Sequence, residues 1–318
     1  MGISLDPRLV KTRTAIILLI ALVLAPVLLL AGLLYASKQR VPPPDTVHFQ
    51  EGVVYGKGGD QELKLDLARP KIAPSGRLPA MVMIHGGGWT AGDRSDFHGL
   101  QFHLAQAGVV CVTVQYRLAP KSKFPAQVED VKCAVRWLRA HADEYGVDPE
   151  RIAALGASAG AHLAMMLAVT SDQSQLEGIG GSAGFSSKVV AAVGLAGPYD
   201  LTLAYANSSR QRAQEGQAVR GMLEGFLGGT PAQVAEAYQA ASPVSYVRKE
   251  VAPLFLCHGE QDPLVPVEQA DVMVAKLREA GAEVEYVKIP DGSHDSFGKD
   301  QEKHLLKMVA FLRRNLKM

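Results

Sequence analysis

This sequence has few cysteines and almost no net charge. Cys111, Cys133 and Cys257 are its three cysteines, and all of them lie in apolar, periodic segments. An odd number without metal-ligand spacing argues against a disulfide framework and a metal site, and favours buried free thiols. Lys and Arg number 33 against 32 Asp and Glu, for a net charge of +1. This balance gives no sign of a nucleic-acid partner or of strong electrostatic steering.

The sequence also lacks a visible internal repeat. With 318 residues and 47% hydrophobic side chains, it can bury a core large enough for one domain, or for a domain with an insertion. A literal match to the dinucleotide-binding fingerprint occurs at residues 178–183. The match has no strand before it and no helix after it, so we reject that function. The Gly- and Ser-rich stretch 177–187 is instead predicted to be a surface loop.

A long uncharged run covers residues 15–36. It is long enough to cross a bilayer, which takes about 20 residues, and no clean signal-peptide cleavage site follows it. We predict an uncleaved transmembrane signal-anchor, between a basic segment over 1–14 and a proline-rich linker over 37–48. The basic flank favours a domain on the non-cytoplasmic side. The alternative is a cleaved signal peptide and a secreted or periplasmic protein.

From residue 49 to 318, strand-like and helix-like segments alternate. After a hairpin over 53–67, strands are predicted over the apolar segments 80–84, 109–114, 152–155, 189–195, 254–257 and 284–289. Helices are predicted over 100–107, 125–142, 161–169, 266–280 and 305–316. Several strands are apolar on both faces, which predicts an α/β fold with a mostly parallel sheet covered by helices on both faces. Functional residues gather at the carboxyl ends of the strands in such sheets.

Residues 199–250 interrupt this alternation with short helical patterns and polar turns. Because the segment follows a strand end, we predict an inserted helical lid over the site. The alternative is a peripheral insertion that makes no contact with substrate.

A serine lies between two glycines in Gly156-Ala-Ser158-Ala-Gly160, at a junction between a predicted strand and a predicted helix. This is the nucleophile-elbow pattern G-x-S-x-G. The sharp turn forces the serine into a strained backbone conformation, and a β-carbon at either glycine would collide with a neighbouring strand or helix. On these five residues alone, a flexible loop is an equally good interpretation.

Nucleophilic catalysis by serine also needs a base, a carboxylate that orients the base, and donors for the oxyanion. Among nine histidines, His294 is the predicted base because it lies in a turn after the last strand. His162 is near Ser158 in sequence, but it lies on the helix that leaves the elbow. We therefore expect it to be packed rather than catalytic.

Asp262 is the predicted orienting carboxylate, since it follows the strand that ends at residue 257. Glu260 is a close rival, and Asp291 and Asp295 are more distant ones. The resulting chain order of serine, acid and histidine is the order found in α/β-hydrolases.

The glycine-rich loop over residues 85–88 offers backbone N–H groups without side-chain cover. We predict that Gly87, Gly88 and Ala159 form the oxyanion hole. Loss of one such donor typically costs about 2.7–4 kcal/mol of transition-state stabilisation.

Six motifs together carry a family resemblance, and they lie at residues 85–89, 116–120, 124–130, 156–160, 258–266 and 292–294. From about residue 50 onward, the sequence resembles the hormone-sensitive-lipase-like α/β-hydrolases, and particularly the BD-FAE-like esterases. The resemblance implies hydrolysis of small-molecule carboxylic esters through an acyl-serine intermediate, without a cofactor or metal. Trp89, Tyr116 and Tyr199 follow strand ends, and we expect them to be walls of the substrate pocket.

Small or medium acyl esters are the expected substrates. Two alternatives stay open. The same machinery could cleave an amide, as formamidases and peptidases of this fold do. The domain could also be a non-catalytic binding module, because a fold does not determine a function.

Overall fold

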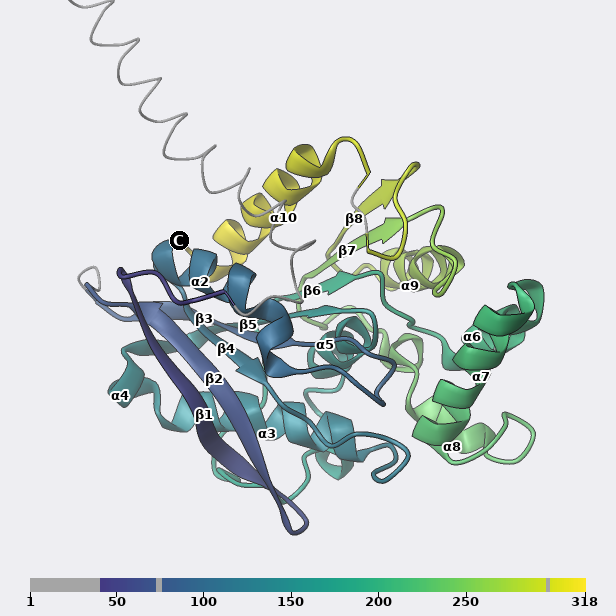
Figure 1. The fold of residues 1–318 in the computed structure, drawn as a ribbon, viewed down its shortest axis with the longest axis horizontal. Coiled ribbons are helices and arrows are strands. Elements are labelled where there is room, and N and C mark those ends of the chain that lie inside the picture. The colour runs from purple at the N-terminus through teal and green to yellow at the C-terminus, as the bar shows by residue number, and fades with distance from the viewer. Residues whose placement is uncertain (1–40, 73–75, 296–297) are drawn as a thin grey trace, which may run out of the picture.

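The computed structural model describes residues 41–72, 76–295 and 298–318. Its centre is an eight-stranded sheet in the order β1-β2-β4-β3-β5-β6-β7-β8 (Figure 1). β2 is antiparallel to β1 and β4, and the later neighbours pair in parallel. The strands are β1 (Val47–Gly58), β2 (Gln61–Pro70), β3 (Leu78–Ile84), β4 (Val110–Val114), β5 (Val147–Ala157), β6 (Ala192–Leu195), β7 (Leu254–Gly259) and β8 (Val284–Ile289).

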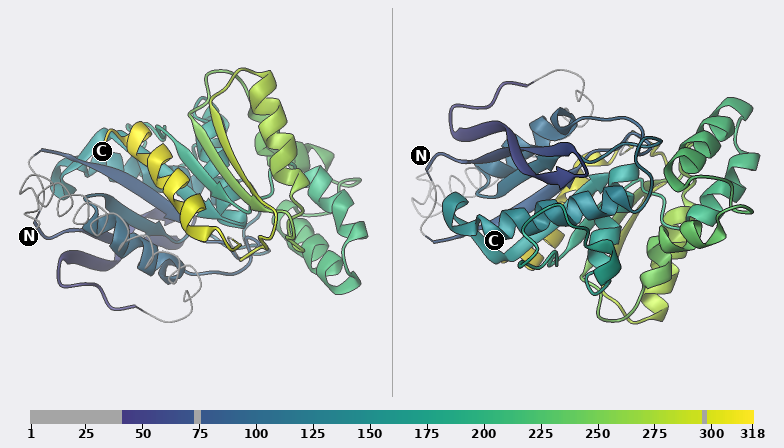
Figure 2. Two further views of the ribbon diagram at one scale, coloured as in Figure 1. Left: turned by 90° about the horizontal axis from the view of Figure 1, so that it is seen from above. Right: turned by 90° about the horizontal axis from the view of Figure 1, so that it is seen from below.

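Helices cover both faces of this sheet, as predicted. They are α2 (His98–Gln106), α3 (Ala126–Ala140), α4 (Ala142–Tyr145), α5 (Ala159–Val169), α9 (Glu268–Glu279) and α10 (Gln301–Leu316). The hydrophobic residues of α3, α5 and α9 join one core cluster, and those of α10 join a second cluster on the other face of the sheet. The two views of Figure 2 look onto these faces, with α10 in front in one view and α3 in front in the other.

The central strands are buried on both faces, which explains their continuous apolar sequences. Every residue of β3 and β4 is buried. Along β3, Val82 packs in the cluster that contains α3 and α5, while Met81 and Met83 pack in the cluster that contains α10. Because side chains alternate along a strand, a strand that has helices on both sides needs apolar residues at every position.

The segment 199–250 forms a group of short helices. They are α6 (Leu201–Asn207), η3 (Ser208–Arg210), α7 (Ala213–Leu227), α8 (Ala235–Ala240) and η4 (Pro243–Tyr246). Figure 1 shows α6, α7 and α8 together at one end of the sheet, after β6 in the chain and before β7.

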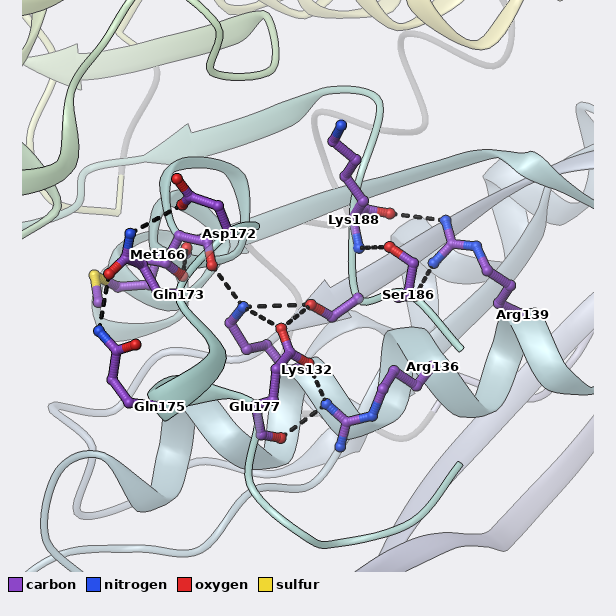
Figure 3. Close-up of polar contacts among 12 residues, drawn as sticks. Lys132, Arg136, Arg139, Met166, Asp172, Gln173, Gln175, Glu177, Ser186 and Lys188 are labelled. Atoms are coloured by element: carbon purple, nitrogen blue, oxygen red, sulfur yellow. Dashed lines mark hydrogen bonds and ion pairs between the residues drawn. The ribbon is translucent and has the colours of Figure 1, made fainter. Parts of the chain in front are cut away.

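A buried ion-pair cluster ties α3 to the segment that follows α5 (Figure 3). The ammonium group of Lys132 is fully buried and donates to Thr170 O at 2.8 Å and to Glu177 Oε1 at 2.7 Å. Arg136 donates to the other carboxylate oxygen at 2.5 Å. Burial lowers the pKa of Lys132, although Glu177 opposes this effect. The pKa of Glu177 is lowered, because its bonds to Lys132, Ser187 and Arg136 outweigh its own burial.

The rejected dinucleotide fingerprint at 178–183 follows the 3-10 turn η2 (Ser174–Leu176), and no helix begins directly after it. The fingerprint therefore lacks the preceding strand and the following helix that its function requires. The three cysteines are buried and free, also as predicted.

Along the described ranges, no helix has both the length and the apolar character needed to cross a membrane. The predicted transmembrane segment over 15–36, the basic segment over 1–14 and the first part of the linker lie outside the described residues.

Candidate active site

The serine elbow has the strained geometry that its sequence predicts. Ser158 connects β5 to α5 with φ 55° and ψ −123°. A β-carbon on Gly156 would lie 2.1 Å from Gly160 O, and one on Gly160 would lie 2.0 Å from Ile84 O. Both distances are too short for any side chain, so the predicted collisions are confirmed. The Ser158 N–H donates to Leu195 O at 2.8 Å and ties the turn to β6.

The structure brings Ser158, Asp262 and His294 into one hydrogen-bonded line. Nε2 of His294 lies 3.0 Å from Ser158 Oγ, across 136 positions of sequence. Nδ1 of His294 lies 2.7 Å from Asp262 Oδ2. The other carboxylate oxygen accepts from the backbone N–H groups of Leu264 at 2.9 Å and Val265 at 2.8 Å. These bonds hold the carboxylate in a single orientation.

The hydrogen bonds in this line select the tautomer of the neutral His294 ring that can accept from the serine. Burial alone would lower the pKa of His294, but the hydrogen bond and charge of Asp262 outweigh burial and raise it. The pKa of Asp262 lies well below its usual range, because bonds from His258, His294 and the backbone outweigh its burial. An ionised carboxylate can only accept hydrogen bonds. Nδ1 therefore carries the proton, and Nε2 is left to accept from Ser158.

The rival carboxylates do not reach the histidine Nδ1. Glu260 is exposed, and its backbone N–H bonds to Ile289 O at 2.8 Å. Asp291 is also exposed and accepts from the N–H of Lys299 at 3.0 Å. Asp295 lies at the exposed side of the neighbouring cavity.

A cavity of about 510 Å³ opens beside the serine and histidine. This volume falls within the range of small-molecule sites. Gly87, Gly88, Trp89 and Ala159 line it, next to Ser158. The insertion supplies an apolar wall, made by Ala204, Val219, Met222 and Leu223.

Gly87 and Gly88 of the loop over 85–88 have left-handed conformations that place their backbone against neighbouring atoms. Gly87 has φ +103°, and a β-carbon there would lie 2.3 Å from Ala91 O. Gly88 has φ +58°, and a β-carbon there would lie 2.0 Å from Met222 Sδ. Ala159 is the first residue of α5, and the first N–H groups of a helix have no acceptor within it. Gly87, Gly88 and Ala159 therefore line the cavity beside Ser158, and their role as oxyanion donors stays a prediction.

Two of the three expected pocket walls lie elsewhere. Trp89 lines the cavity, but Tyr116 and Tyr199 do not. Tyr116 is buried, donates to His85 O at 3.0 Å and stacks on the His85 ring. Tyr199 is fully buried against Gly194 and Gly197. Their position after strand ends was predicted correctly, but both rings turn back into the core, where a large aromatic side chain buries the most apolar surface.

The residues that the insertion adds to the cavity were not predicted from the sequence. Val219, Met222 and Leu223 lie on α7 at spacings of three and four residues, which is one face of a helix. That periodicity was readable in the sequence. The surface that this apolar face covers could not be predicted, because a local pattern does not specify the partner of an apolar face. Over the described ranges, no three His, Cys, Asp or Glu side chains gather as metal ligands would.

A mostly parallel sheet with helices on both faces, and a serine elbow aligned with a histidine and an aspartate, define an α/β-hydrolase. The sequence matches the BD-FAE family over residues 65–277. The chain belongs to this family.

Curated relatives include two proteins of Mycobacterium tuberculosis. The esterase LipQ is 36% identical over 76% of this chain and 56% of its own length. The probable carboxylic ester hydrolase LipM is 35% identical over 79% of this chain and 58% of its own length. The chain thus spans little more than half the length of these relatives.

Similar solved structures have comparable folds. A truncated carbohydrate esterase from gut microbiota has a TM-score of 0.72 and 25% identity, covering 87% of this chain and 99% of that one. A thermophilic esterase of Thermogutta terrifontis has a TM-score of 0.68 and 28% identity, covering 88% of this chain and 96% of that one.

Proposed function

We propose that this protein is a serine hydrolase of carboxylic esters. The observation that carries the proposal is the line from Ser158 Oγ to His294 Nε2 at 3.0 Å and from His294 Nδ1 to Asp262 at 2.7 Å. The line borders a cavity of about 510 Å³. The names of the relatives, which are esterases and carboxylic ester hydrolases, give further support.

The reaction begins when Ser158 Oγ attacks the ester carbonyl and its proton passes to Nε2 of His294. The N–H groups of Gly87, Gly88 and Ala159 bind the oxyanion of the tetrahedral intermediate. When the intermediate collapses, the ester C–O bond breaks and the leaving alcohol takes the proton from Nε2. Water then gives a proton to Nε2 and attacks the acyl-serine. The acid leaves, and Ser158 regains its proton.

Small or medium acyl chains are the proposed acyl groups. Support comes from the apolar wall of the cavity and from its moderate volume. One solved structure of the Thermogutta terrifontis esterase contains bound propionate, and the gut protein is called a carbohydrate esterase. A panel of aryl esters and sugar acetates with increasing acyl length would identify the preferred class.

The direct test compares wild-type protein with Ser158→Ala and His294→Ala. We expect each variant to lose at least about 10³-fold in kcat while it remains folded. Wild-type turnover by either variant would overturn the assignment.

Labelling of Ser158 by a fluorophosphonate probe separates an enzyme from a non-catalytic binding module. Faster cleavage of an amide than of its matched ester would favour an amidase.

We propose that the insertion over 199–250 acts as a lid, because four of its residues line the cavity. We also propose that residues 15–36 anchor the protein, with the domain over 49–318 on the non-cytoplasmic side. The uncharged run and its basic flank support this. Fractionation should then recover the protein in membranes after an alkaline wash. Recovery of a shortened chain in the soluble fraction would favour signal cleavage.

A further inference from the structure

A buried hydrogen bond joins the glycine-rich loop to the helix that follows the serine. Trp89 comes directly after Gly88, and its indole N–H donates to Nδ1 of His162 at 3.1 Å. His162 lies on α5, about one helical turn after Ser158. Its Nε2–H donates to the carbonyl of Ala241 at 2.7 Å. Both ring nitrogens are thus satisfied, and the two partners select one neutral tautomer.

Trp89 needs such support because its backbone is not favourable by itself. Its φ of 60° lies in the left-handed region, which bulky residues rarely adopt. Its ring stacks on Phe226 of α7, with centroids 4.4 Å apart and an angle of 3° between the planes. The ring of His162 stands at 90° to the indole, with centroids 5.2 Å apart. The indole is therefore held on its face by Phe226 and at its N–H by His162.

We propose that His162 is a positioning residue for the oxyanion hole, and this inference rests on the proposed ester hydrolysis. The bond that Trp89 donates to His162 fixes the indole, and Trp89 fixes the neighbouring Gly88 peptide. The bond to Ala241, just after α8, joins the insertion to the same histidine. The side chain of His162 thus connects α5, the glycine-rich loop over residues 85–88 and the insertion over 199–250.

The environment of His162 suits this role. Its side chain is fully buried, and burial lowers its pKa to about 4. The ring therefore stays neutral in the range where serine hydrolysis operates, and Nδ1 stays an acceptor. A protonated ring would have donors at both nitrogens and could not accept from Trp89.

Two substitutions separate the two bonds. In His162→Asn, the amide oxygen occupies the place of Nδ1 and can still accept from Trp89. In His162→Gln, the amide nitrogen reaches the place of Nε2 and can still donate to Ala241, but Trp89 loses its acceptor. Both variants lose one buried hydrogen bond, so a purely structural histidine would respond to both substitutions alike.

We expect H162N to keep kcat within about threefold of wild type. We expect H162Q to lower kcat about tenfold, with KM changed by less than about twofold, because a displaced oxyanion donor weakens only the transition state. Their melting temperatures should fall by similar amounts. Equal kcat values for the two variants, or a change in KM alone, would overturn the inference.

Trp89→Phe removes the donor of the same bond rather than its acceptor. It still tests the inference if the His162 variants do not fold. It keeps the stack on Phe226 and removes the indole donor, so kcat should again fall about tenfold. The double variant W89F/H162Q should be no slower than either single variant, since one interaction is lost in each. Unchanged kcat in W89F would contradict the role.

His141→Gln is a matched control. His141 stacks on Trp137, the second tryptophan of the sequence, with ring centroids 4.4 Å apart. It directly follows α3 and does not line the cavity. The kcat of His141→Gln should equal that of wild type.

If wild-type protein hydrolyses no ester, the proposed function fails and this inference fails with it. If wild-type protein is active and H162N matches H162Q, this inference alone fails.

Discussion

Asp262 holds its place through hydrogen bonds on both carboxylate oxygens. Two backbone N–H groups of its own turn donate to Oδ1, and His294 donates to Oδ2. These contacts keep the carboxylate charged in a buried position, where an unpaired charge would be strongly unfavourable. The charge in turn raises the pKa of His294 against the effect of burial. Asp262 therefore both orients the ring of His294 and raises its pKa.

The first prediction follows from this pKa. Only neutral imidazole accepts the serine proton, so kcat/KM should fall as the pH drops through a pKa above the ordinary value of about 6.5. Asp262→Asn removes the charge that raises this pKa and leaves burial, which lowers it. The acid limb should then move to lower pH, while kcat falls on the order of 10³–10⁴-fold. Profiles of rate against pH for both proteins test this. An acid limb at the same pH in both would contradict it.

At the scale of elements, α7 joins the insertion to the site. One face of the helix lines the cavity, and Met222 lies directly over Gly88. The same helix carries Phe226, which stacks on Trp89. The insertion is thus packed against the glycine-rich loop over residues 85–88 and also lines the cavity. A change in its position would alter both binding and catalysis.

The second prediction concerns Met222, whose side chain lines the cavity. Met222→Ala should enlarge the cavity and raise the ratio of kcat/KM for a longer acyl ester over acetate by about tenfold. Met222→Leu keeps the volume and should leave this ratio near that of wild type. A series of acyl esters from acetate to octanoate provides the measurement. If M222A and M222L gave the same ratio, Met222 would not limit acyl length.

At the scale of the whole molecule, two buried cations hold a long connection in place. Lys132 and Arg136 lie on one face of α3 and share the carboxylate of Glu177, which lies between α5 and β6 (Figure 3). Breaking a buried ion pair by removing one partner is far more harmful than losing a surface pair, because the other charge remains buried.

The third prediction compares a buried pair with an exposed one. Glu177→Gln should lower the free energy of unfolding by about 2–4 kcal/mol, since Lys132 and Arg136 then lack a counter-charge. Glu285→Gln removes the partner of Arg314 at the surface and should cost at most about 1 kcal/mol. Urea denaturation of both variants gives the comparison. Equal midpoints would mean that the cluster contributes no more than a surface pair.

Most of the fold was predictable because apolar runs and their breaks are local properties. The strand predicted over 80–84 is β3, with two more residues at its start, and the helix predicted over 266–280 is α9 almost to its ends. The first hairpin was predicted too short. β1 begins at Val47, and its register shifts between Gln50 and Val53 around Gly52, which has φ +73°. A bulged edge strand lacks the regular alternation that a pattern detects.

The sequence by itself determined which residues follow strand ends, because the carboxyl ends of parallel strands meet at one edge of a sheet. This is why Ser158, Asp262 and His294 could be named in advance. Tertiary structure alone decided that Asp262 rather than Glu260 faces the histidine, that Tyr116 turns into the core, and that Trp89 bonds to His162. Those outcomes depend on side-chain direction and on contacts between segments far apart in the chain, and no local pattern of residues encodes either one.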